Sequence, residues 1–257
     1  MHNAAFAELG LNWRYVACEV DPKNLRAAID GAKAMNFAGI NLTVPHKLLA
    51  VDMVDELDAS AKTWGAVNTI KFEAGRAIGF NTDADAIVTS LREDLKIDLR
   101  GKKVLLLGAG GAGRTAALKL AAEKVAELFL INRTRSKAEQ IANGIKNQFP
   151  GLKVSVDYPK DKVDLILNAT SLGLKPDDAS PLDEKLFPLK NTGAVYDMIY
   201  RPAETALLAA AKKSGCRTAN GLGMLLHQGA KAFEIWTGKT APLAVMRRAL
   251  EENIYGK

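Results

Sequence analysis

The stretch Val104-Leu-Leu-Leu-Gly108-Ala-Gly-Gly-Ala-Gly113 decides the fold of this chain. It joins a short apolar run to an alanine-rich stretch, Arg114 to Glu123, and so predicts a strand, a glycine turn and a helix in that order. The glycine spacing fits G-x-G-x-x-G, in which the first glycine makes the turn, the second lets the backbone approach a pyrophosphate, and the third lets the helix pack on the strand. A glycine-rich turn can also serve only to connect a strand to a helix. Its place between an apolar run and a helix favours dinucleotide binding, with phosphates at the helix N-terminus. The cofactor-binding residues predicted here are Gly108, Ala109, Gly110, Gly111 and Ala112.

A basic run follows the next predicted strand, Glu127 to Ile131. In an NAD-binding domain, an acidic residue about 20 residues past the glycines binds the ribose 2′-hydroxyl. Here that place holds Asn132-Arg133-Thr134-Arg135-Ser136-Lys137. Guanidinium groups bind a 2′-phosphate through charge-assisted hydrogen bonds, whereas a carboxylate would repel it. The alternative is a solvated basic helix start, but cations at a helix N-terminus oppose its dipole. The run therefore predicts NADP as the cofactor.

The rest of the chain alternates short β-type runs with amphipathic stretches, which predicts an α/β protein built from βα units around two parallel sheets. Further strands are expected at Val163 to Asn168 and at Gly193 to Asp197, in a Rossmann-type NADP-binding domain over residues 84–225. The helix Ala84 to Leu95 is expected to connect it to a substrate domain over residues 1–83. Helices within Leu222 to Ile254 would return to that first domain, so residues 226–257 belong to it and it is discontinuous.

The first domain is expected to begin with a helix, Met1 to Gly10, whose apolar residues share one face. A strand at Trp13 to Val20, a helix opened by Asp21-Pro22 and a strand at Ala38 to Val44 would follow. A doubly wound sheet normally enters a helix from a strand, and no strand precedes Met1. On topological grounds we therefore expect the sequence to begin in mid-fold.

Composition narrows the function classes. The 257 residues include 48% hydrophobic and 25% charged residues, which is ordinary for a globular protein. No apolar run approaches the ~18 residues needed to cross a bilayer, and no signal peptide opens the sequence, so we expect a cytoplasmic protein with no membrane partner. The formal net charge of +6 is spread among acidic residues, which favours a small anionic ligand over nucleic acid. Cys18 and Cys216 are interpreted as buried free thiols, and the three histidines form no apparent metal site.

Two residues could carry proton transfer. Lys47 ends the run Asn41-Leu-Thr-Val-Pro-His-Lys47, and Asp83 ends Gly79-Phe-Asn-Thr-Asp83. An ammonium and a carboxylate near one another can pass a proton to or from a carbinol oxygen as a hydride moves. On spacing alone they could equally form a structural surface ion pair, as most Lys–Asp pairs do.

An ordered set of motifs resembles the shikimate dehydrogenase family. The motifs are Asn41 to Lys47, Gly65-Ala-Val-Asn-Thr69, Asn81-Thr-Asp83, Gly108 to Gly113, Asn132-Arg-Thr134, Asn168-Ala-Thr-Ser171, Tyr196-Asp-Met-Ile-Tyr200, and Asn220-Gly-Leu-Gly-Met224 with Gln228. The resemblance implies reversible reduction of 3-dehydroshikimate to shikimate with NADPH, a step of aromatic amino-acid biosynthesis, by a monomer or homodimer.

Carried over by position, the resemblance makes Lys47 the acid/base residue and Asp83 its partner, both in contact with substrate. It places Thr43, Asn68, Tyr200 and Gln228 in the substrate pocket. It places Met198, Gly221 and Met224 against the nicotinamide half of NADP, with Thr170 and Ser171 close by. For the two methionines, core packing is an equally good interpretation.

The family normally has a strand and a serine pair that holds the substrate carboxylate just before the motif that begins here at Met1-His-Asn-Ala-Ala-Phe6. Neither is found in the 257 residues. We therefore expect these 257 residues alone to bind NADP with little shikimate turnover. Two alternatives stay open: a quinate/shikimate dehydrogenase that takes NAD, against which the basic run argues, and a catalytically silent NADP-binding protein.

Overall fold

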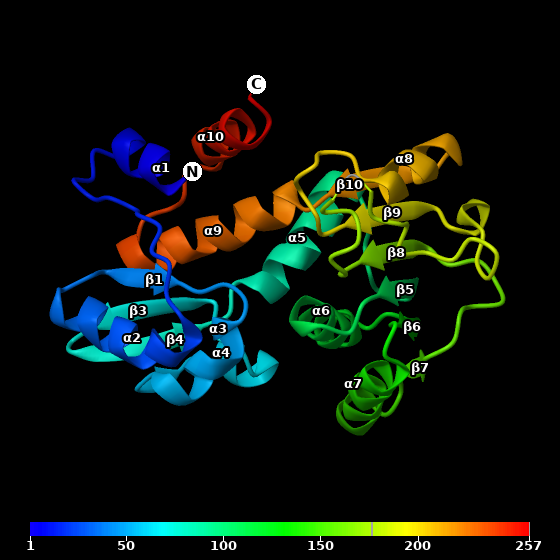
Figure 1. Cartoon of the computed structure of the whole chain (residues 1–257), viewed down its shortest axis with the longest axis horizontal. Helices are drawn as coiled ribbons and strands as arrows, with labels where there is room; N and C mark the ends of the chain where they lie inside the picture. Colours follow the sequence, from blue (N-terminus) through cyan, green and yellow to red (C-terminus); the bar gives the residue numbers. More distant parts are fainter. Residues whose placement is uncertain (176, 257) are drawn as a thin grey trace. The chain divides into compact units, whose positions relative to one another are not determined.

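The computed structural model describes residues 1–175 and 177–256 and separates into two compact units. One unit comprises Met1–Ala86 with Leu226–Lys257, and the other comprises Ile87–Leu225 (Figure 1). The chain passes between them inside helix α5 (Asp83–Leu95) and inside helix α9 (Leu222–Thr237). The first crossing thus lies within α5, slightly past the boundary expected at Asp83.

The second unit is built on a six-stranded parallel sheet in the order β10-β9-β8-β5-β6-β7. From β5 the chain runs outward through β6 and β7, then returns beside β5 and runs outward again through β8, β9 and β10. Dinucleotides bind at the carboxyl ends of strands where this order reverses, which is between β5 and β8. The strands are β5 (Lys103–Leu107), β6 (Glu127–Ile131), β7 (Lys153–Ser155), β8 (Leu165–Asn168), β9 (Ala194–Asp197) and β10 (Arg217–Asn220).

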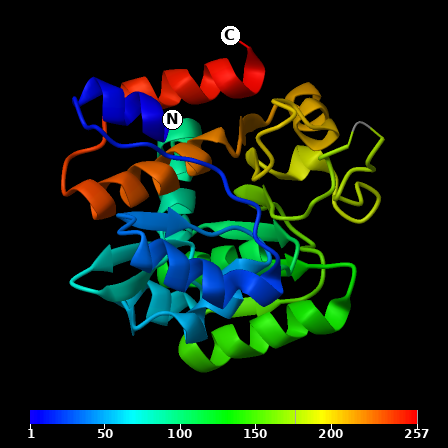
Figure 2. The ribbon, with the colours of Figure 1, turned by 60° about the vertical axis from the view of Figure 1, so that its left-hand side comes forward.

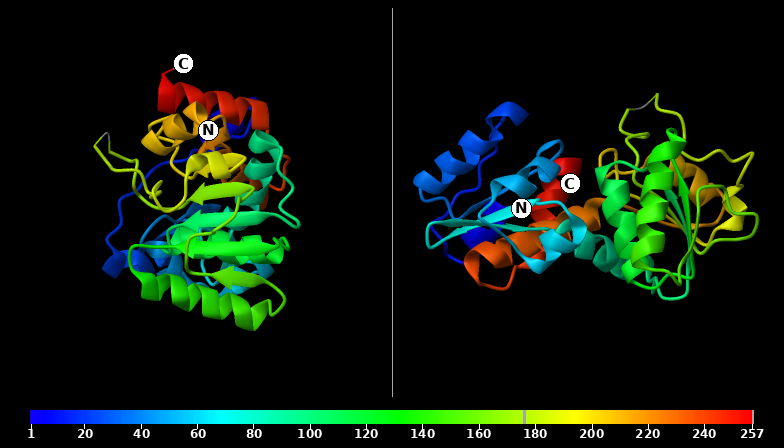
Figure 3. Two further views of the ribbon diagram at one scale, coloured as in Figure 1. Left: turned by 90° about the vertical axis from the view of Figure 1, so that its right-hand side faces the viewer. Right: turned by 90° about the horizontal axis from the view of Figure 1, so that it is seen from below.

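Helices cover this sheet on both faces, as its buried apolar strands require. Helices α6 (Gly111–Ala122) and α7 (Arg135–Gln148) pack side by side along β5, β6 and β7, whereas α8 (Ala206–Lys213) packs on β9 and β10 (Figure 3). One core cluster joins Leu105 and Leu107 of β5 to Val195 of β9 and Leu208 of α8. The short 3-10 helix η3 (Leu189–Asn191) precedes β9. The predicted Rossmann-type organisation of this part of the chain is confirmed.

The first unit differs from expectation, because its sheet is mainly antiparallel. Its order is β1-β3-β4-β2, and only β2 and β4 run parallel. The prediction of a second parallel sheet is wrong because β3 and β4 form a hairpin. Its turn at Ala74-Gly75 puts both residues at positive φ, as a type I′ hairpin turn requires. The strands are β1 (Gly39–Asn41), β2 (Glu56–Leu57), β3 (Thr69–Glu73) and β4 (Arg76–Phe80).

The segment Trp13 to Val20, predicted as a strand, has no regular secondary structure. Its β-branched and aromatic residues favour a strand only beside a pairing neighbour. Here the Tyr15 N–H instead donates to the side chain of Asn3, 2.7 Å away. Cys18 is exposed in this segment, so the prediction that both thiols are buried holds only for Cys216. The strand predicted at Ala38 to Val44 shortens to β1.

Helices of the first unit lie on both sides of its small sheet. The predicted N-terminal helix is confirmed as α1 (His2–Glu8), which packs beside α10 (Leu243–Tyr255) (Figure 2). Asp21 begins the next helical stretch by accepting the Lys23 N–H at 3.0 Å. That stretch consists of η1 (Pro22–Asn24) and α2 (Leu25–Ala34), and α3 (His46–Leu49), η2 (Ala50–Met53) and α4 (Ala59–Trp64) follow. Within the described residues, no helix is long and apolar enough to cross a membrane.

Candidate active site

Close packing requires glycine at two positions of the turn after β5. Gly108 has φ +106°, and a Cβ there would lie 2.9 Å from the backbone of Ala169 at the end of β8. A Cβ on Gly113 would collide with the carbonyl of Gly108, so this glycine lets α6 approach the turn. Gly110 caps α6 without a side-chain hydrogen bond. The N-terminal N–H groups of α6 therefore have no side-chain cap in the turn, and they are suited to bind an anion.

The basic run begins beside this turn. The Asn132 side chain accepts the Ala109 N–H at 3.0 Å and donates to the carbonyl of Thr134 at 2.8 Å. The two arginines differ. Arg135 pairs with Glu139 and Asp157, each at 2.9 Å, whereas exposed Arg133 has no ion-pair partner in the described part of the chain. Ser136 and Lys137 are exposed in the first turn of α7. Arg133 is therefore the guanidinium group available to a 2′-phosphate.

The loops after β8 and β9 contact one another. The Asn168 side chain accepts the Thr170 N–H at 3.0 Å and the Thr170 hydroxyl at 2.8 Å, and exposed Ser171 follows. The Met198 N–H donates to the Asn168 carbonyl at 2.9 Å. A Cβ on Gly221 would collide with the Met198 carbonyl, so only glycine allows this approach at the start of α9. Of the residues expected beside the nicotinamide, Met198 and Gly221 thus lie together, and Met224 lies on the first turn of α9.

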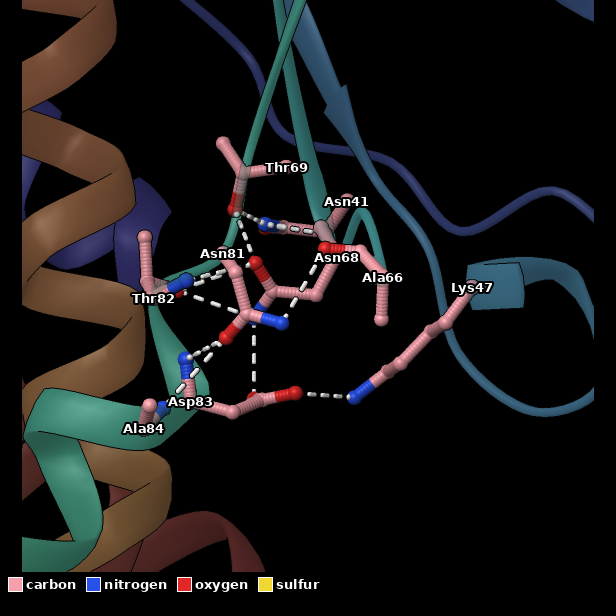
Figure 4. A network of polar contacts seen from close by, with 9 residues as sticks. All are labelled: Asn41, Lys47, Ala66, Asn68, Thr69, Asn81, Thr82, Asp83 and Ala84. Carbon is pink, nitrogen blue, oxygen red and sulfur yellow. Dashed lines mark hydrogen bonds and ion pairs between the residues drawn. The ribbon is translucent and has the colours of Figure 1, made fainter. Parts of the chain in front are cut away.

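In the other unit, Lys47 and Asp83 form an ion pair in which Nζ lies 2.7 Å from a carboxylate oxygen (Figure 4). Their side chains are 28% and 12% exposed, so the pair is sheltered but open to solvent. Lys47 belongs to the short helix α3 rather than to the end of a strand, and its carbonyl accepts the Val67 N–H at 2.9 Å. This arrangement leaves the ammonium and the carboxylate able to exchange a proton with a bound molecule.

Asn68 lies behind this pair and is 1% exposed. Its amide group donates to the second oxygen of Asp83 and to the hydroxyl of Thr82, both at 2.9 Å (Figure 4). Its side-chain oxygen accepts the Thr82 N–H at 2.8 Å. Both amide hydrogens are thus used inside the protein, and Asn68 in this structure orients Asp83 rather than facing solvent.

Two further polar residues, to which the sequence patterns assign no role, orient the pair. The Asn81 side chain accepts the N–H groups of Asp83 and Ala84, at 3.1 and 3.3 Å, and so caps α5. Asp83 therefore lies in the first turn of a helix, where the dipole favours a carboxylate. Asn41 binds Thr69 at 2.9 Å, and Thr69 in turn binds Asn68 at 3.1 Å. The Asn-Thr-Asp order ahead of a helical stretch is the signal that could have predicted the cap.

Family comparisons match most of this chain. A family model described as the shikimate dehydrogenase substrate binding domain matches residues 1–70, one described as shikimate / quinate 5-dehydrogenase matches residues 90–172, and one described as the shikimate 5'-dehydrogenase C-terminal domain matches residues 221–251. A curated relative from Methanocaldococcus jannaschii, named shikimate dehydrogenase (NADP(+)), is 44% identical over 99% of this chain and 91% of its own length. The chain belongs to the shikimate dehydrogenase family.

Solved structures agree with that assignment. A crystal structure of a shikimate dehydrogenase in complex with NADP+ is 42% identical, covers 98% of this chain and 89% of its own, and has a TM-score of 0.90. A ligand-free 5-ketofructose reductase of Gluconobacter sp. strain CHM43 is 38% identical, covers 98% of this chain and 92% of its own, and has a TM-score of 0.86. The second likeness shows that this architecture also serves another carbonyl substrate, so the substrate has to be argued from the site.

The remaining residues that the family resemblance implies are spread over both units. Thr43 is exposed just before α3, and its carbonyl accepts the His46 N–H at 2.9 Å. Gln228 lies half-buried on α9, and Tyr200, 37% exposed, lies in the loop after β9. His46 does not contact the Lys47 ammonium, because its ring binds the Val20 carbonyl at 2.9 Å. Among the described residues, no group of three His, Cys, Asp or Glu side chains could hold a metal.

Proposed function

We propose that this member of the shikimate dehydrogenase family catalyses the reversible NADPH-dependent reduction of 3-dehydroshikimate to shikimate. The observation that carries the proposal is the sheltered Lys47–Asp83 pair, whose ammonium and carboxylate are 2.7 Å apart and open to solvent. It is supported by a nucleotide-binding turn and an unpaired arginine in the other unit, and by relatives named for this activity.

NADP fits the residues present in the second unit. The pyrophosphate would lie on the Gly108–Gly113 turn and the N-terminus of α6, and the 2′-phosphate beside Arg133 and the first turn of α7. The loops carrying Thr170, Met198 and Gly221 would line the nicotinamide side, with Ser171 and Met224 nearby. When bound, NADPH supplies the hydride that reduces the carbonyl carbon.

Lys47 supplies the proton in this proposal. As the carbonyl carbon of the substrate accepts a hydride, negative charge develops on its oxygen, and the Lys47 ammonium donates a proton to that oxygen to complete the hydroxyl. In the oxidative direction the neutral Lys47 amine accepts the same proton. The step balances, because one hydride and one proton convert one carbonyl group to one secondary alcohol.

Asp83 keeps the ammonium at the reacting oxygen. One carboxylate oxygen binds Lys47 and the other is held by Asn68, so the carboxylate cannot rotate away without breaking both contacts. Held in this way, Asp83 can also accept a hydrogen bond from a substrate hydroxyl. The polar side chains of Thr43 and Gln228, which belong to the same unit as the pair, would meet further hydroxyl groups, each of which needs a partner once it leaves water.

The test is an initial-rate assay of the full-length protein with 3-dehydroshikimate and either NADPH or NADH. We expect oxidation of NADPH at a much higher kcat/KM than of NADH. The same assay with 5-ketofructose and with 3-dehydroquinate tests the substrate, and both should react far more slowly. Protein that binds NADP+ yet oxidises no NADPH with 3-dehydroshikimate would overturn the proposal.

The two alternatives predict different results in this assay. A quinate/shikimate dehydrogenase that takes NAD would prefer NADH and reduce 3-dehydroquinate, and unpaired Arg133 argues against it. A silent NADP-binding protein would show cofactor affinity without turnover, and the intact Lys47–Asp83 pair argues against that. A cytoplasmic location and a monomeric or homodimeric state stay predictions.

A further inference from the structure

Asp197, the last residue of β9, is a carboxylate that the proposed chemistry does not use. Its side chain is fully buried, and within residues 1–175 and 177–256 it has no ion-pair partner. Three neutral donors surround it instead. One oxygen accepts the Asn168 amide at 2.9 Å and the Ile199 N–H at 3.0 Å, and the other accepts the Thr205 hydroxyl at 2.7 Å.

These donors belong to three segments, which are the end of β8, the loop after β9 and the start of α8. Asn168 is the last residue of β8, and its side-chain oxygen accepts a hydrogen bond from the hydroxyl of Thr170 in the loop that follows. Ile199 follows Met198 in the loop after β9, and its carbonyl accepts the Gly221 N–H at 3.1 Å. Thr205 caps α8 by accepting the Leu208 N–H at 3.3 Å. The carboxylate therefore joins both strand-end loops to the start of a helix.

Stability does not explain this arrangement. Burial raises the pKa of Asp197, against the three hydrogen bonds that lower it, so the ionised group is costly where it lies. Well-packed apolar residues of similar volume often stabilise a core at least as well as buried charged groups do. An acceptor with two oxygens does achieve something that an apolar residue cannot, because it fixes the direction of three donors at once.

We infer that Asp197 is a positioning residue that holds the loops after β8 and β9 in the conformation that receives the nicotinamide half of the cofactor. The inference rests on the proposed binding of NADP in this unit. It assigns Asp197 no contact with the cofactor. The residue acts through Thr170 and Met198, which its partners orient, so the loops are ordered before the cofactor binds and less affinity is lost in ordering them.

The adenosine half of the site gives an internal control. Adenosine 2′,5′-bisphosphate carries the adenosine and the 2′-phosphate but no nicotinamide, and Arg133 and α7 lie across the sheet from Asp197, beyond β8 and β5. A variant that only disturbs the loops should lose affinity for NADP+ and keep affinity for the bisphosphate. A variant that damages the whole unit should lose both.

Two substitutions separate hydrogen bonding from charge. In Asp197→Asn, the side-chain oxygen can accept from Asn168 and Ile199 while its amide group donates to the Thr205 hydroxyl, so the geometry survives without the charge. In Asp197→Ala, three donors lose their acceptor. Thr205→Val and Thr205→Ser form a milder pair that removes or keeps one of the three donors.

The experiment is titration calorimetry of the full-length protein and these variants with NADP+ and with adenosine 2′,5′-bisphosphate. For Asp197→Ala we expect the Kd for NADP+ to rise about tenfold or more and the Kd for the bisphosphate to stay within about twofold. Asp197→Asn should bind both ligands nearly as the parent does. Thr205→Val should raise the Kd for NADP+ a few-fold and leave the Kd for the bisphosphate unchanged, and Thr205→Ser should change neither. If Asp197→Ala does not fold, this pair of variants tests the inference in its place.

Equal losses for both ligands in Asp197→Ala, or no loss for either, would overturn the inference. The inference would also be overturned if Asp197→Asn bound NADP+ as weakly as Asp197→Ala does, since the charge of Asp197 and not its hydrogen bonds would then determine the affinity. A parent protein that binds neither ligand would instead overturn the proposed cofactor, and with it this inference.

Discussion

The two units each contain an aspartate near the end of a strand, and the two aspartates have opposite surroundings. Asp83 is paired with the ammonium of Lys47 and is partly open to solvent. Asp197 is fully buried, and its hydrogen-bond donors among the described residues are all neutral. A carboxylate that is paired with a cation and open to solvent can take part in proton transfer with a bound molecule, whereas the buried carboxylate of Asp197 holds three donors in place.

The difference separates chemistry from positioning in this protein. The first unit contributes charge that can change during a reaction, and the polar residues behind it, Asn68 and Asn81, are neutral. The second unit contributes a glycine turn, a pair of loops in contact with one another, and Arg133, which has no ion-pair partner among the described residues. Substitutions in the first unit should therefore change turnover, and those in the second should change cofactor binding.

The largest effect is expected from Lys47→Ala. Loss of the general acid should lower kcat by about 10² to 10⁴, while the Kd for NADP+ stays unchanged because the nucleotide site lies in the other unit. Initial rates and calorimetry on the full-length protein measure both quantities. Lys71→Ala, which removes a lysine of similar exposure that pairs with Glu73 on β3, is the matched control. Near-parental turnover in Lys47→Ala would end the assignment of Lys47 as the acid.

Acid should weaken the first unit selectively. Burial lowers the pKa of His2 to about 4, so the folded state prefers the neutral ring. Above pH 6.5 the ring is neutral in both the folded and the unfolded state, and the folded state loses no stability. As the pH falls from 6.5 toward 4, the unfolded state takes up a proton that folded His2 does not, so the free energy of unfolding falls, by about 3 kcal/mol at most. The raised pKa of Asp197 has the opposite sign, because its folded state takes up a proton more readily as the pH falls.

Hydrogen exchange resolved by unit measures this difference. Between pH 6.5 and 4, protection of α1 and α9 should decline before that of β5 and β8, and His2→Gln should remove much of that decline. The same pH profile for the first unit in parent and variant would show that His2 does not cause the sensitivity.

Cofactor preference should depend on Arg133 more than on Arg135. Arg133→Asp removes an unpaired guanidinium and adds a charge that repels the 2′-phosphate, so binding of NADP+ should weaken by about 1.5–3 kcal/mol and preference should move toward NAD+. Arg135→Asp is the matched control, since Arg135 is already engaged by Glu139 and Asp157. Calorimetry with NADP+ and with NAD+ measures the preference. If Arg133→Asp and the parent bind NADP+ with equal affinity, Arg133 does not bind the 2′-phosphate.

The smallest effect concerns the cap of α5. Asn81→Ala leaves the Asp83 and Ala84 N–H groups without their side-chain acceptor and should lower the free energy of unfolding by about 1–2 kcal/mol. Turnover should fall modestly, because Asp83 loses one of its supports. Chemical denaturation and initial rates measure the two. An unchanged kcat at reduced stability would show that Asn81 serves the helix alone.

Sequence reasoning predicted the second unit better than the first, because its information is local. The strand Glu127 to Ile131 is confirmed to the residue, and the turn Gly108 to Gly113 joins its strand and helix as predicted, since glycine spacing and apolar runs are read within a short window. The prediction of a parallel sheet in the first unit is wrong, because its runs resemble βα units while the Ala74-Gly75 turn makes two of them a hairpin.

The candidate site divides in the same way. Lys47 and Asp83 could be named from motifs, and the structure places them together. The orienting role of Asn68 could not be predicted, because it depends on contacts among Thr82, Asp83 and Thr69 that form only when β3 and the start of α5 come together. The donors around Asp197 likewise come from three separate segments.

The most direct test of the central claim is one distance in a crystal structure of the full-length protein with NADP+ and shikimate. Lys47 Nζ should lie at about 2.7–3.2 Å, hydrogen-bonding distance, from the shikimate hydroxyl oxygen that is oxidised, and that oxygen should also contact Asp83. A structure in which the Lys47–Asp83 pair stays closed and the reacting hydroxyl is bound elsewhere would contradict the account.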